Sequence, residues 1–361
     1  MFDLIKYILT FGSVLGITPS VDKTRDDICS RIYFLCIAVI LTIGFMVSWN
    51  YKRLDLKDFS ILEGTIQICT DLSLYMCTIT SILSGSIFKQ KKWKKMCNNL
   101  KQLQSNLPER NRTFLPYYLA FAAYLGIVGL VIISTINLWW KVGNYDYFKM
   151  FTINLVESLA HHIHYSVLFV FTKAFSVYYQ RAKLLLMKKI TTYRNLEATL
   201  SGKTHELFSE VYTSWAVLKD SVDIFNDIFG WRILLSFTHA TAFIISFLDK
   251  ILRNNDGFVG GDFSQATITN LCAVCNIFAN IVIVVVLCDF VLLEARETLQ
   301  IAINFRGTVL KESRDLEKMT CFLENNLPEF SAARFFHISR STIFSIVNII
   351  ITFLIITLQF K

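Results

Sequence analysis

Long apolar segments recur along the whole chain and limit what it can fold into. A helix needs roughly 20 apolar residues to cross the hydrocarbon core of a bilayer, which is about 30 Å thick. Hydrophobic residues make up 53% of the chain and its mean hydropathy is +0.46, well above what soluble domains carry. A membrane-length window predicts seven spans, at residues 30–49, 62–88, 114–140, 150–180, 231–251, 266–293 and 339–360. We therefore predict an all-α, multi-pass membrane protein with seven transmembrane helices.

The basic residues predict the orientation of these spans. We expect the first span to serve as its own signal, because residues 1–20 lack the apolar core and small cleavage-site residues of a signal peptide. Of the 36 Lys and Arg residues, 26 lie on the N-terminal side and eight on the opposite side. Basic residues concentrate in cytoplasmic loops. The N-terminus is thus predicted to be cytoplasmic and the C-terminus extracellular, with the net charge of +8 facing membrane lipids rather than nucleic acid.

The connections between spans differ between the two sides. The predicted outer loops, 50–61, 141–149 and 252–265, are short and contain none of the nine cysteines, so we expect no disulfide framework. Cys272 and Cys275 have CxxC spacing but no second pair, which favours packing over a metal site. We predict no metal and no cofactor. The sequon at Asn111 falls in a predicted cytoplasmic link and should stay unmodified.

The cytoplasmic links are long and patterned for helices. In the link 181–230, apolar residues recur at steps of three and four, at Leu207, Val211, Trp215, Leu218, Val222 and Phe225. The link 294–338 behaves similarly. Two interpretations remain open: these segments are helical extensions that fold on one another, or they also form a platform where subunits meet.

The C-terminal segment, residues 330–360, leads into the last predicted span and forms it. Phe336, Ile338, Ser341, Phe344 and Ser345 precede or begin this span, and Thr352, Gln359 and Phe360 lie toward its end. This pattern resembles the C-terminal region of insect gustatory receptors. The family's final motif is Thr-Tyr, five apolar residues and Gln-Phe. Here Thr352, Gln359 and Phe360 match it, whereas Phe353 replaces the Tyr and Thr357 interrupts the apolar five.

The resemblance implies a tastant-gated, non-selective cation channel in the plasma membrane. It implies a homo- or heterotetramer with other gustatory receptors, a central pore lined by span 7 of each subunit, and a gate near Ile356 and Phe360. The implied pore face is Asn348, Thr352, Ile355, Ile356, Gln359 and Phe360. A buried Gln amide needs a partner or a wet pore, and an apolar ring can gate by dewetting. The alternative is that Gln359 reaches headgroups while Asn348 and Thr352 bond between helices.

We accordingly expect two functional parts. Residues 1–293 form the ligand-sensing bundle of spans 1–6 with cytoplasmic extensions, and residues 294–361 form a cytoplasmic anchor helix and the pore-lining span 7.

Polar residues inside the other spans mark a candidate ligand pocket. An outward-facing cavity within spans 2–6 would bind a small tastant. Its candidate residues are Gln67, Asp71, Tyr75, Glu157, His161, His164, Tyr165, His239, Thr241 and Asn276. The competing interpretation is interhelical hydrogen bonding, with Glu157 satisfied by His161. The His and Glu residues also make half of a metal site, but too few further ligands accompany them.

Other function classes fit the sequence less well. A G-protein-coupled receptor has the opposite orientation, and a transporter shows helix breaks or repeats. No clustered nucleophile or metal set indicates an enzyme. The odorant-receptor type of channel subunit is the nearest alternative, because it shares the architecture, although the Gln-Phe ending favours the gustatory branch. The sequence leaves open whether the tastant is a sugar or a bitter compound, and whether a co-receptor is needed.

Overall fold

The computed structural model describes residues 2–14, 16–19, 27–55, 61–83, 88–108, 115–142, 145–196, 204–253, 261–308 and 314–359. These residues are almost entirely helical. In chain order the elements are α1 (Phe2–Val14), α2 (Asp27–Asp55), α3 (Ile61–Ile82), α4 (Gln90–Asn106), α5 (Leu115–Val142), α6 (Tyr145–Leu196), α7 (Thr204–Arg253), α8 (Gly261–Thr308), α9 (Arg314–Asn325), β1 (Ser331–Ala332), β2 (Phe336–His337) and α10 (Arg340–Gln359).

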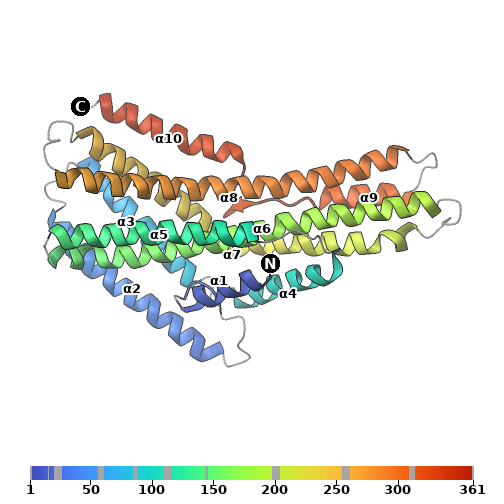
Figure 1. Ribbon diagram of the computed structural model, residues 1–361, viewed down its shortest axis with the longest axis horizontal. Coiled ribbons are helices and arrows are strands. Elements are labelled where there is room, and N and C mark those ends of the chain that lie inside the picture. Colours follow the sequence, from blue (N-terminus) through green and yellow to red (C-terminus); the bar gives the residue numbers. More distant parts are fainter. Residues whose placement is uncertain are drawn as a thin grey trace.

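Each of the seven predicted spans coincides with one helix over most of its length, although the span 62–88 runs past the end of α3 at Ile82. They fall in α2, α3, α5, α6, α7, α8 and α10, so the prediction of an all-α protein with seven membrane helices is confirmed. Within the described residues, stretches of α2, α7, α8 and α10 are long and apolar enough to cross a membrane on composition alone. Figure 1 places the C-terminal end of α10 at the same end of the molecule as the C-terminal ends of α2, α5 and α7.

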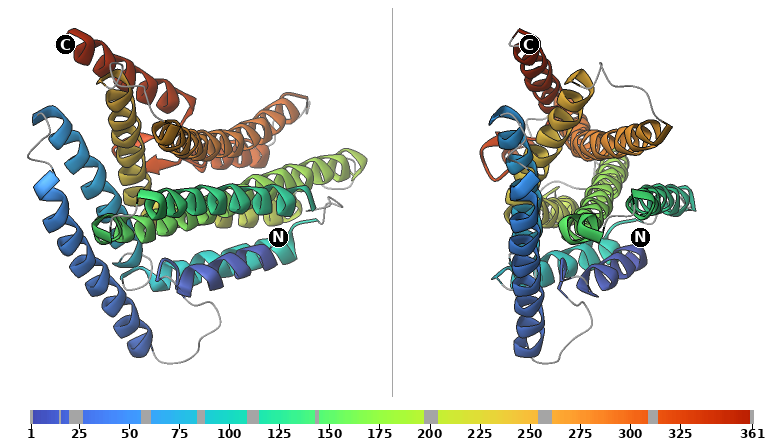
Figure 2. Two further views of the ribbon diagram at one scale, coloured as in Figure 1. Left: turned by 60° about the vertical axis from the view of Figure 1, so that its left-hand side comes forward. Right: turned by 90° about the vertical axis from the view of Figure 1, so that its left-hand side faces the viewer.

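Helices α6, α7 and α8 are much longer than a membrane crossing. They contain 52, 50 and 48 residues. At 1.5 Å per residue the longest extends about 78 Å, against about 30 Å for the hydrocarbon core. The three helices run side by side past the rest of the bundle, and α9 packs against their far part (Figures 1 and 2). The helical extensions expected from the links 181–230 and 294–338 are therefore present.

The part of α6, α7 and α8 beyond the predicted spans has a buried aromatic core like that of a soluble protein. Tyr179 meets Trp215 edge to face with ring centroids 5.2 Å apart, and the Trp215 indole Nε1 donates a hydrogen bond of 3.0 Å to the Asn326 carbonyl. Nearer the membrane, Trp93 of α4 packs edge to face on Phe171 and Phe229. Aromatic edge-to-face pairs add to the stabilisation from burial alone, so Trp93 holds α4 onto α6 and α7, and the edge-to-face pair of Tyr212 and Phe322 does the same for α9 and α7.

The membrane half looks different, because its outer surface is apolar. Helix α2 exposes large side chains such as Ile40 and Met46, and α5 exposes Leu130 and Trp140. Monomeric soluble proteins rarely expose apolar surface of this extent, whereas lipid contacts require it. Exposed apolar side chains thus cover the predicted spans, whereas the buried aromatic core lies in the extension.

A short hairpin connects α9 to the last helix. Strands β1 and β2 pair antiparallel, and the turn residues Ala333 and Arg334 have positive φ angles of 51° and 64°, as a tight hairpin turn requires. The turn lies against Gly230 of α7, where an added Cβ would approach the Ala333 nitrogen to 2.8 Å. Helix α10 then begins with a capping arrangement in which the Ser339 N–H donates to Thr342 Oγ1 at 3.2 Å. Gly230 therefore permits the chain to enter α10 directly from the surface of α7.

Candidate functional site

Helix α10 has one packed face and one unpacked face. Packed against α7 and α8 are Thr342, Ile346, Ile350 and Thr357. The opposite face is exposed in the single chain. Along its centre lie Ser341, Ser345, Asn348, Thr352, Ile355, Ile356 and Gln359, and the exposed apolar residues Phe344, Ile349 and Ile351 border them. The central positions recur at steps of three and four, which places them along one stripe of the helix. The stripe is polar for most of its length and becomes apolar at Ile355 and Ile356.

The stripe contains the pore residues predicted from the sequence. Asn348, Thr352, Ile355, Ile356 and Gln359 are all exposed, and Phe360 lies outside the described residues. The hydroxyl of Thr357, on the packed side, donates to the Phe353 carbonyl one turn back at 3.0 Å. The two threonines near the end of α10 thus serve different faces of the helix.

A cavity opens between α5, α6 and α8 in the membrane half. Its volume is about 120 Å³. The lining residues are Tyr124, Tyr165, Ser166, Phe169, Asn280, Ile283 and Val284. The walls are mostly apolar, and Tyr124, Ser166 and Asn280 supply a few polar groups, as is typical of small-molecule sites.

Of the predicted pocket residues, Tyr165 lines this cavity. Asn276 lies one helical turn from Asn280, whose side-chain amide donates to the Asn276 Oδ1 at 3.3 Å. Tyr124 on the opposite wall hydrogen-bonds the His162 Nδ1 at 3.1 Å. The Tyr165 hydroxyl is itself fully buried, beside Ser236 of α7, so its ring rather than its hydroxyl contributes to the cavity wall.

A second polar group surrounds Asp71 of α3. Its carboxylate accepts a hydrogen bond of 2.9 Å from Lys52 Nζ, and both side chains are almost fully buried. Asn154 and Gln67 donate to the other carboxylate oxygen at 2.9 and 3.3 Å. Tyr75, one turn along α3, instead stacks on Phe45 of α2 with ring centroids 4.3 Å apart. Gln67, Asp71 and Tyr75 therefore join α3 to α2 and α6.

Lys52 lies elsewhere than hydropathy predicts. The sequence predicts it in the outer loop 50–61, but the structure places it within α2, with only 6% of its surface exposed. Its long apolar stem and the facing Phe151 ring, 4.9 Å from the ammonium, allow the charge to reach Asp71. A hydropathy window cannot see such a partner, because the pair forms between two helices.

The histidines of α6 and α7 form a third group. His161 and His239 meet edge to face at 5.2 Å, and the His161 Nδ1 lies 3.5 Å from the Cys77 thiol of α3. His239 Nδ1 contacts the Thr70 carbonyl at 3.2 Å. Thr241 bonds back to its own helix, at the Phe237 carbonyl. Among the described residues, no His, Cys, Asp or Glu cluster has the geometry to hold a metal ion.

Two predicted residues are buried without partners. Neither carboxylate oxygen of Glu157 and neither ring nitrogen of His164 has a hydrogen-bond partner among the described residues, and both side chains have no exposed surface. The proposed bond between Glu157 and His161 is therefore not formed. An unpaired buried polar group costs free energy, so these groups are the ones that a water, proton or ligand would satisfy.

Most cavity-lining residues were not singled out from the sequence. Phe169, Ile283 and Val284 are ordinary apolar residues of spans, so no local signal distinguishes them from lipid-facing positions. Asn280 and Tyr124 are polar or amphipathic groups in apolar spans, which is the one signal that points to them.

The comparisons with known proteins agree with this architecture. A family model described as "7tm Chemosensory receptor" matches residues 5–361. The fold resembles the insect olfactory receptor OR5 from Machilis hrabei in complex with eugenol, with a TM-score of 0.66 and 14% identity over 99% of this chain and 98% of that one. A second structure of the same receptor gives 0.60 and 13%, over 99% and 97%. No curated protein sequence matched this chain.

Proposed function

This chain belongs to the 7tm chemosensory receptor family, and from that premise we propose that it is a gustatory receptor acting as a tastant-gated, non-selective cation channel. The family is one of multi-pass membrane receptors rather than enzymes. The observation that supports channel function best is the exposed polar stripe of α10. A helix that leaves Asn348, Thr352 and Gln359 unpacked in lipid would be unfavourable, because amide groups in hydrocarbon need partners.

Four copies of the stripe around a central axis would remove this cost. The polar side chains would face a water-filled pore, while the packed face, with Ile346 and Ile350, would stay against α7 and α8 of the same subunit. Ile355 and Ile356 would form an apolar ring between the Thr352 and Gln359 layers, which suits a gate that closes by dewetting. The proposed second part of the chain, residues 294–361, then combines α9 as an anchor with α10 as the pore helix.

We further propose that the ligand binds in the cavity between α5, α6 and α8. Its lining contains no charged side chain, so a neutral, largely apolar molecule with one or two hydrogen-bonding groups fits it best. The structurally similar receptor OR5 was solved with eugenol, a molecule of that kind. This cavity lies within the first part of the chain, residues 1–293. The predicted cytoplasmic N-terminus and plasma-membrane location belong to the same proposal.

An odorant-type channel subunit is the alternative, and the similarity to an olfactory receptor favours it as strongly. The two assignments share the pore and the cavity and differ in ligand and partner subunits. The gustatory assignment is supported by the Gln359 ending of α10.

Permeation through Gln359 variants tests the pore. Gln359→Glu adds a negative charge to a ring of pore residues and should raise cation over anion selectivity, while Gln359→Ala should change single-channel conductance at least twofold. The matched control is Ser105→Ala, an exposed residue of α4 far from α10. Currents would be recorded from purified receptor in planar bilayers. Unchanged conductance and selectivity in both Gln359 variants would refute the pore assignment.

A further inference from the structure

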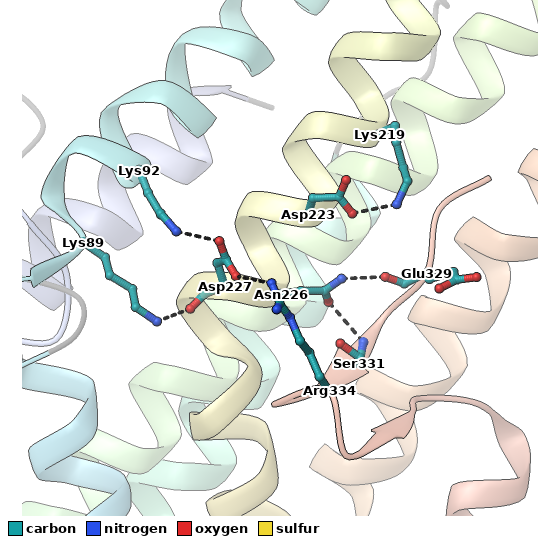
Figure 3. Close-up of polar contacts among 9 residues, drawn as sticks. All are labelled: Lys89, Lys92, Lys219, Asp223, Asn226, Asp227, Glu329, Ser331 and Arg334. Atoms are coloured by element: carbon teal, nitrogen blue, oxygen red, sulfur yellow. Dashed lines mark hydrogen bonds and ion pairs between the residues drawn. The ribbon is translucent and has the colours of Figure 1, made fainter. Parts of the chain in front are cut away.

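Three basic side chains contact one residue where α4, α7 and the hairpin meet, two of them at its carboxylate and one at its main-chain carbonyl (Figure 3). Asp227 of α7 lies between them. Its carboxylate accepts a hydrogen bond of 2.6 Å from Lys92, its main-chain carbonyl accepts one from Lys89, and Arg334 at the hairpin turn approaches to 3.5 Å. Partial burial lowers the pKa of Lys89, and the nearby Asp227 carboxylate offsets part of this lowering. We call Lys89, Lys92 and Arg334, together with Asp227, the basic junction.

The basic junction carries more positive than negative charge. Other acids nearby have their own partners: Asp223 pairs with Lys219 at 2.6 Å and Asp220 with Lys95 at 2.8 Å. Glu329 makes no ion pair with the junction among the described residues, and its main-chain carbonyl accepts from Asn226 at 2.6 Å (Figure 3). With three cations and one carboxylate, the formal excess is two positive charges.

The cations are also available to a ligand. The Arg334 side chain is 87% exposed and Lys92 is 49% exposed. Arginine has five N–H donors in a fixed fork, and lysine has three donors. Arg334 uses one nitrogen on Asp227, so most of its donors point to the surroundings. Arg and Lys with free donors match phosphate oxygens well.

Exposed aromatic side chains border the basic junction. Phe88 precedes Lys89 and is 76% exposed, Phe335 follows Arg334 and is 69% exposed, and Trp231 lies one turn from Asp227 and is 54% exposed. Trp231 and Phe335 pack edge to face at 5.7 Å. Aromatic residues next to basic ones mark the depth of the membrane–water boundary.

The ends of the predicted spans also place the basic junction at the membrane–water boundary. The span 62–88 ends beside Lys89, the span 231–251 begins one turn after Asp227, and α10 begins six residues after Arg334. Three boundaries therefore meet at the basic junction, on the side from which the long helices extend (Figure 1). Phosphate groups of lipids lie at this depth.

We infer that the basic junction is a binding site for the headgroup of an anionic phospholipid, with phosphate on Lys92 and Arg334 and acyl chains against Trp231 and Phe335. The excess of two positive charges matches a phosphorylated headgroup. A bound lipid would connect α4 and α7 to the turn that leads into α10. This inference rests on one part of the proposed function, that the protein spans a membrane, and does not depend on its conducting ions.

The test uses the purified full-length receptor in detergent and measures lipid binding by native mass spectrometry. Dioctanoyl phosphatidylinositol 4,5-bisphosphate should bind at least tenfold more tightly than dioctanoyl phosphatidylcholine. Arg334→Gln and Lys92→Gln should each weaken binding about fivefold, since each basic residue near an anionic surface contributes about that factor. Arg334→Lys should retain most of the affinity.

Arg306→Gln is the control, because Arg306 is an arginine about as exposed as Lys92, lies far along the extension and is paired with Glu317. It should bind the lipid as the wild type does. Free inositol 1,4,5-trisphosphate should bind more weakly than the lipid, because it lacks chains for the aromatic pair. Equal binding of both lipids, no effect of either Gln variant, or equal binding of the free headgroup would overturn the lipid site. None of these outcomes depends on channel activity, so failure here is distinguishable from failure of the proposed function.

Discussion

At the scale of single residues, the buried ion pair of Lys52 and Asp71 is a contact whose loss has a large energetic consequence. Both charges are removed from water, and Gln67 and Asn154 satisfy the second carboxylate oxygen. Such a pair adds little net stability compared with apolar residues, but breaking it leaves an uncompensated charge in a low-dielectric interior. The two single substitutions and the double one should therefore not be additive.

Lys52→Met should lower the free energy of unfolding by about 3 to 5 kcal/mol, because Asp71 is left buried without its cation. The double variant Lys52→Met with Asp71→Asn should recover most of this loss, since the Asn oxygen still accepts from Gln67 and Asn154. Thermal unfolding of the detergent-solubilised receptor measures both. Lys318→Met, which breaks the exposed pair with Asp315, should cost under about 1 kcal/mol. Equal destabilisation by the single and double variants would contradict the pairing.

The ligand cavity makes a second prediction at this scale. Ile283→Phe enlarges a side chain that lines the cavity and should raise the half-maximal concentration of an activating compound about tenfold or more, since small steric changes in apolar pockets have effects of that size. A screen of neutral phenols, beginning with eugenol, would supply the compound. Leu271→Phe makes a similar enlargement at an exposed position of α8 outside the lining. If both variants respond alike, the ligand binds elsewhere.

The sequence predicts the positions of several functional residues but not the residues that they contact. The exposed positions Asn348, Thr352 and Gln359 could be placed on one face from helical spacing and the family motif. Asp71 and His161 could be recognised as polar groups in apolar spans. Their partners could not, because Lys52 and Cys77 meet them across helices far apart in sequence. Which face of a span is lined by a cavity depends on tertiary packing that no local pattern records.

At the scale of elements, the long helices were predictable and the short ones less so. Apolar length identified the seven spans, and the three- and four-residue steps identified the extension of α7, where Trp215, Leu218, Val222 and Phe225 are all fully buried. Helices α1 and α4 are shorter than a membrane crossing and were not expected. The hairpin lacked a sequence signal, because Ala333 and Arg334 occupy positive φ without the usual Gly or Asn.

The hairpin supplies a prediction about how α10 is positioned. Gly230→Ala would place a Cβ 2.8 Å from the Ala333 nitrogen, closer than packed atoms allow, so the backbone of α7 or the hairpin must move. We expect a loss of about 1 to 3 kcal/mol in stability. Gly307→Ala is the control, because nothing lies within 4 Å of its added Cβ. A helical Gly→Ala change with free space should be neutral or stabilising by up to about 1 kcal/mol. Thermal unfolding measures the change in stability of both variants. Equal changes would show that the hairpin does not pack closely against Gly230.

At the scale of the whole molecule, two surfaces of one chain are left unsatisfied in different ways. The apolar surface of α2 and α5 suits lipid, whereas the stripe of α10 mixes amide, hydroxyl and apolar groups and suits neither lipid nor a dry interface. A symmetric assembly around α10 would place the polar stripe on a water-filled pore and leave the apolar surface of α2 and α5 in contact with lipid. Assembly and pore formation would then be one event, because the same face does both.

Cross-linking tests this closure without a ligand. Ile356→Cys places a thiol on the exposed stripe at the proposed constriction, and Thr357→Cys places one on the neighbouring packed face. A disulfide needs Cα atoms within about 7 Å, which only a narrow ring of α10 helices from different subunits can provide. Under mild oxidation the Ile356→Cys receptor should form disulfide-linked dimers well above the wild-type background from its nine native cysteines, and Thr357→Cys should not. Dimers from both variants would show that α10 rotates or packs differently, and dimers from neither would place α10 at the periphery, where the polar stripe would need another partner.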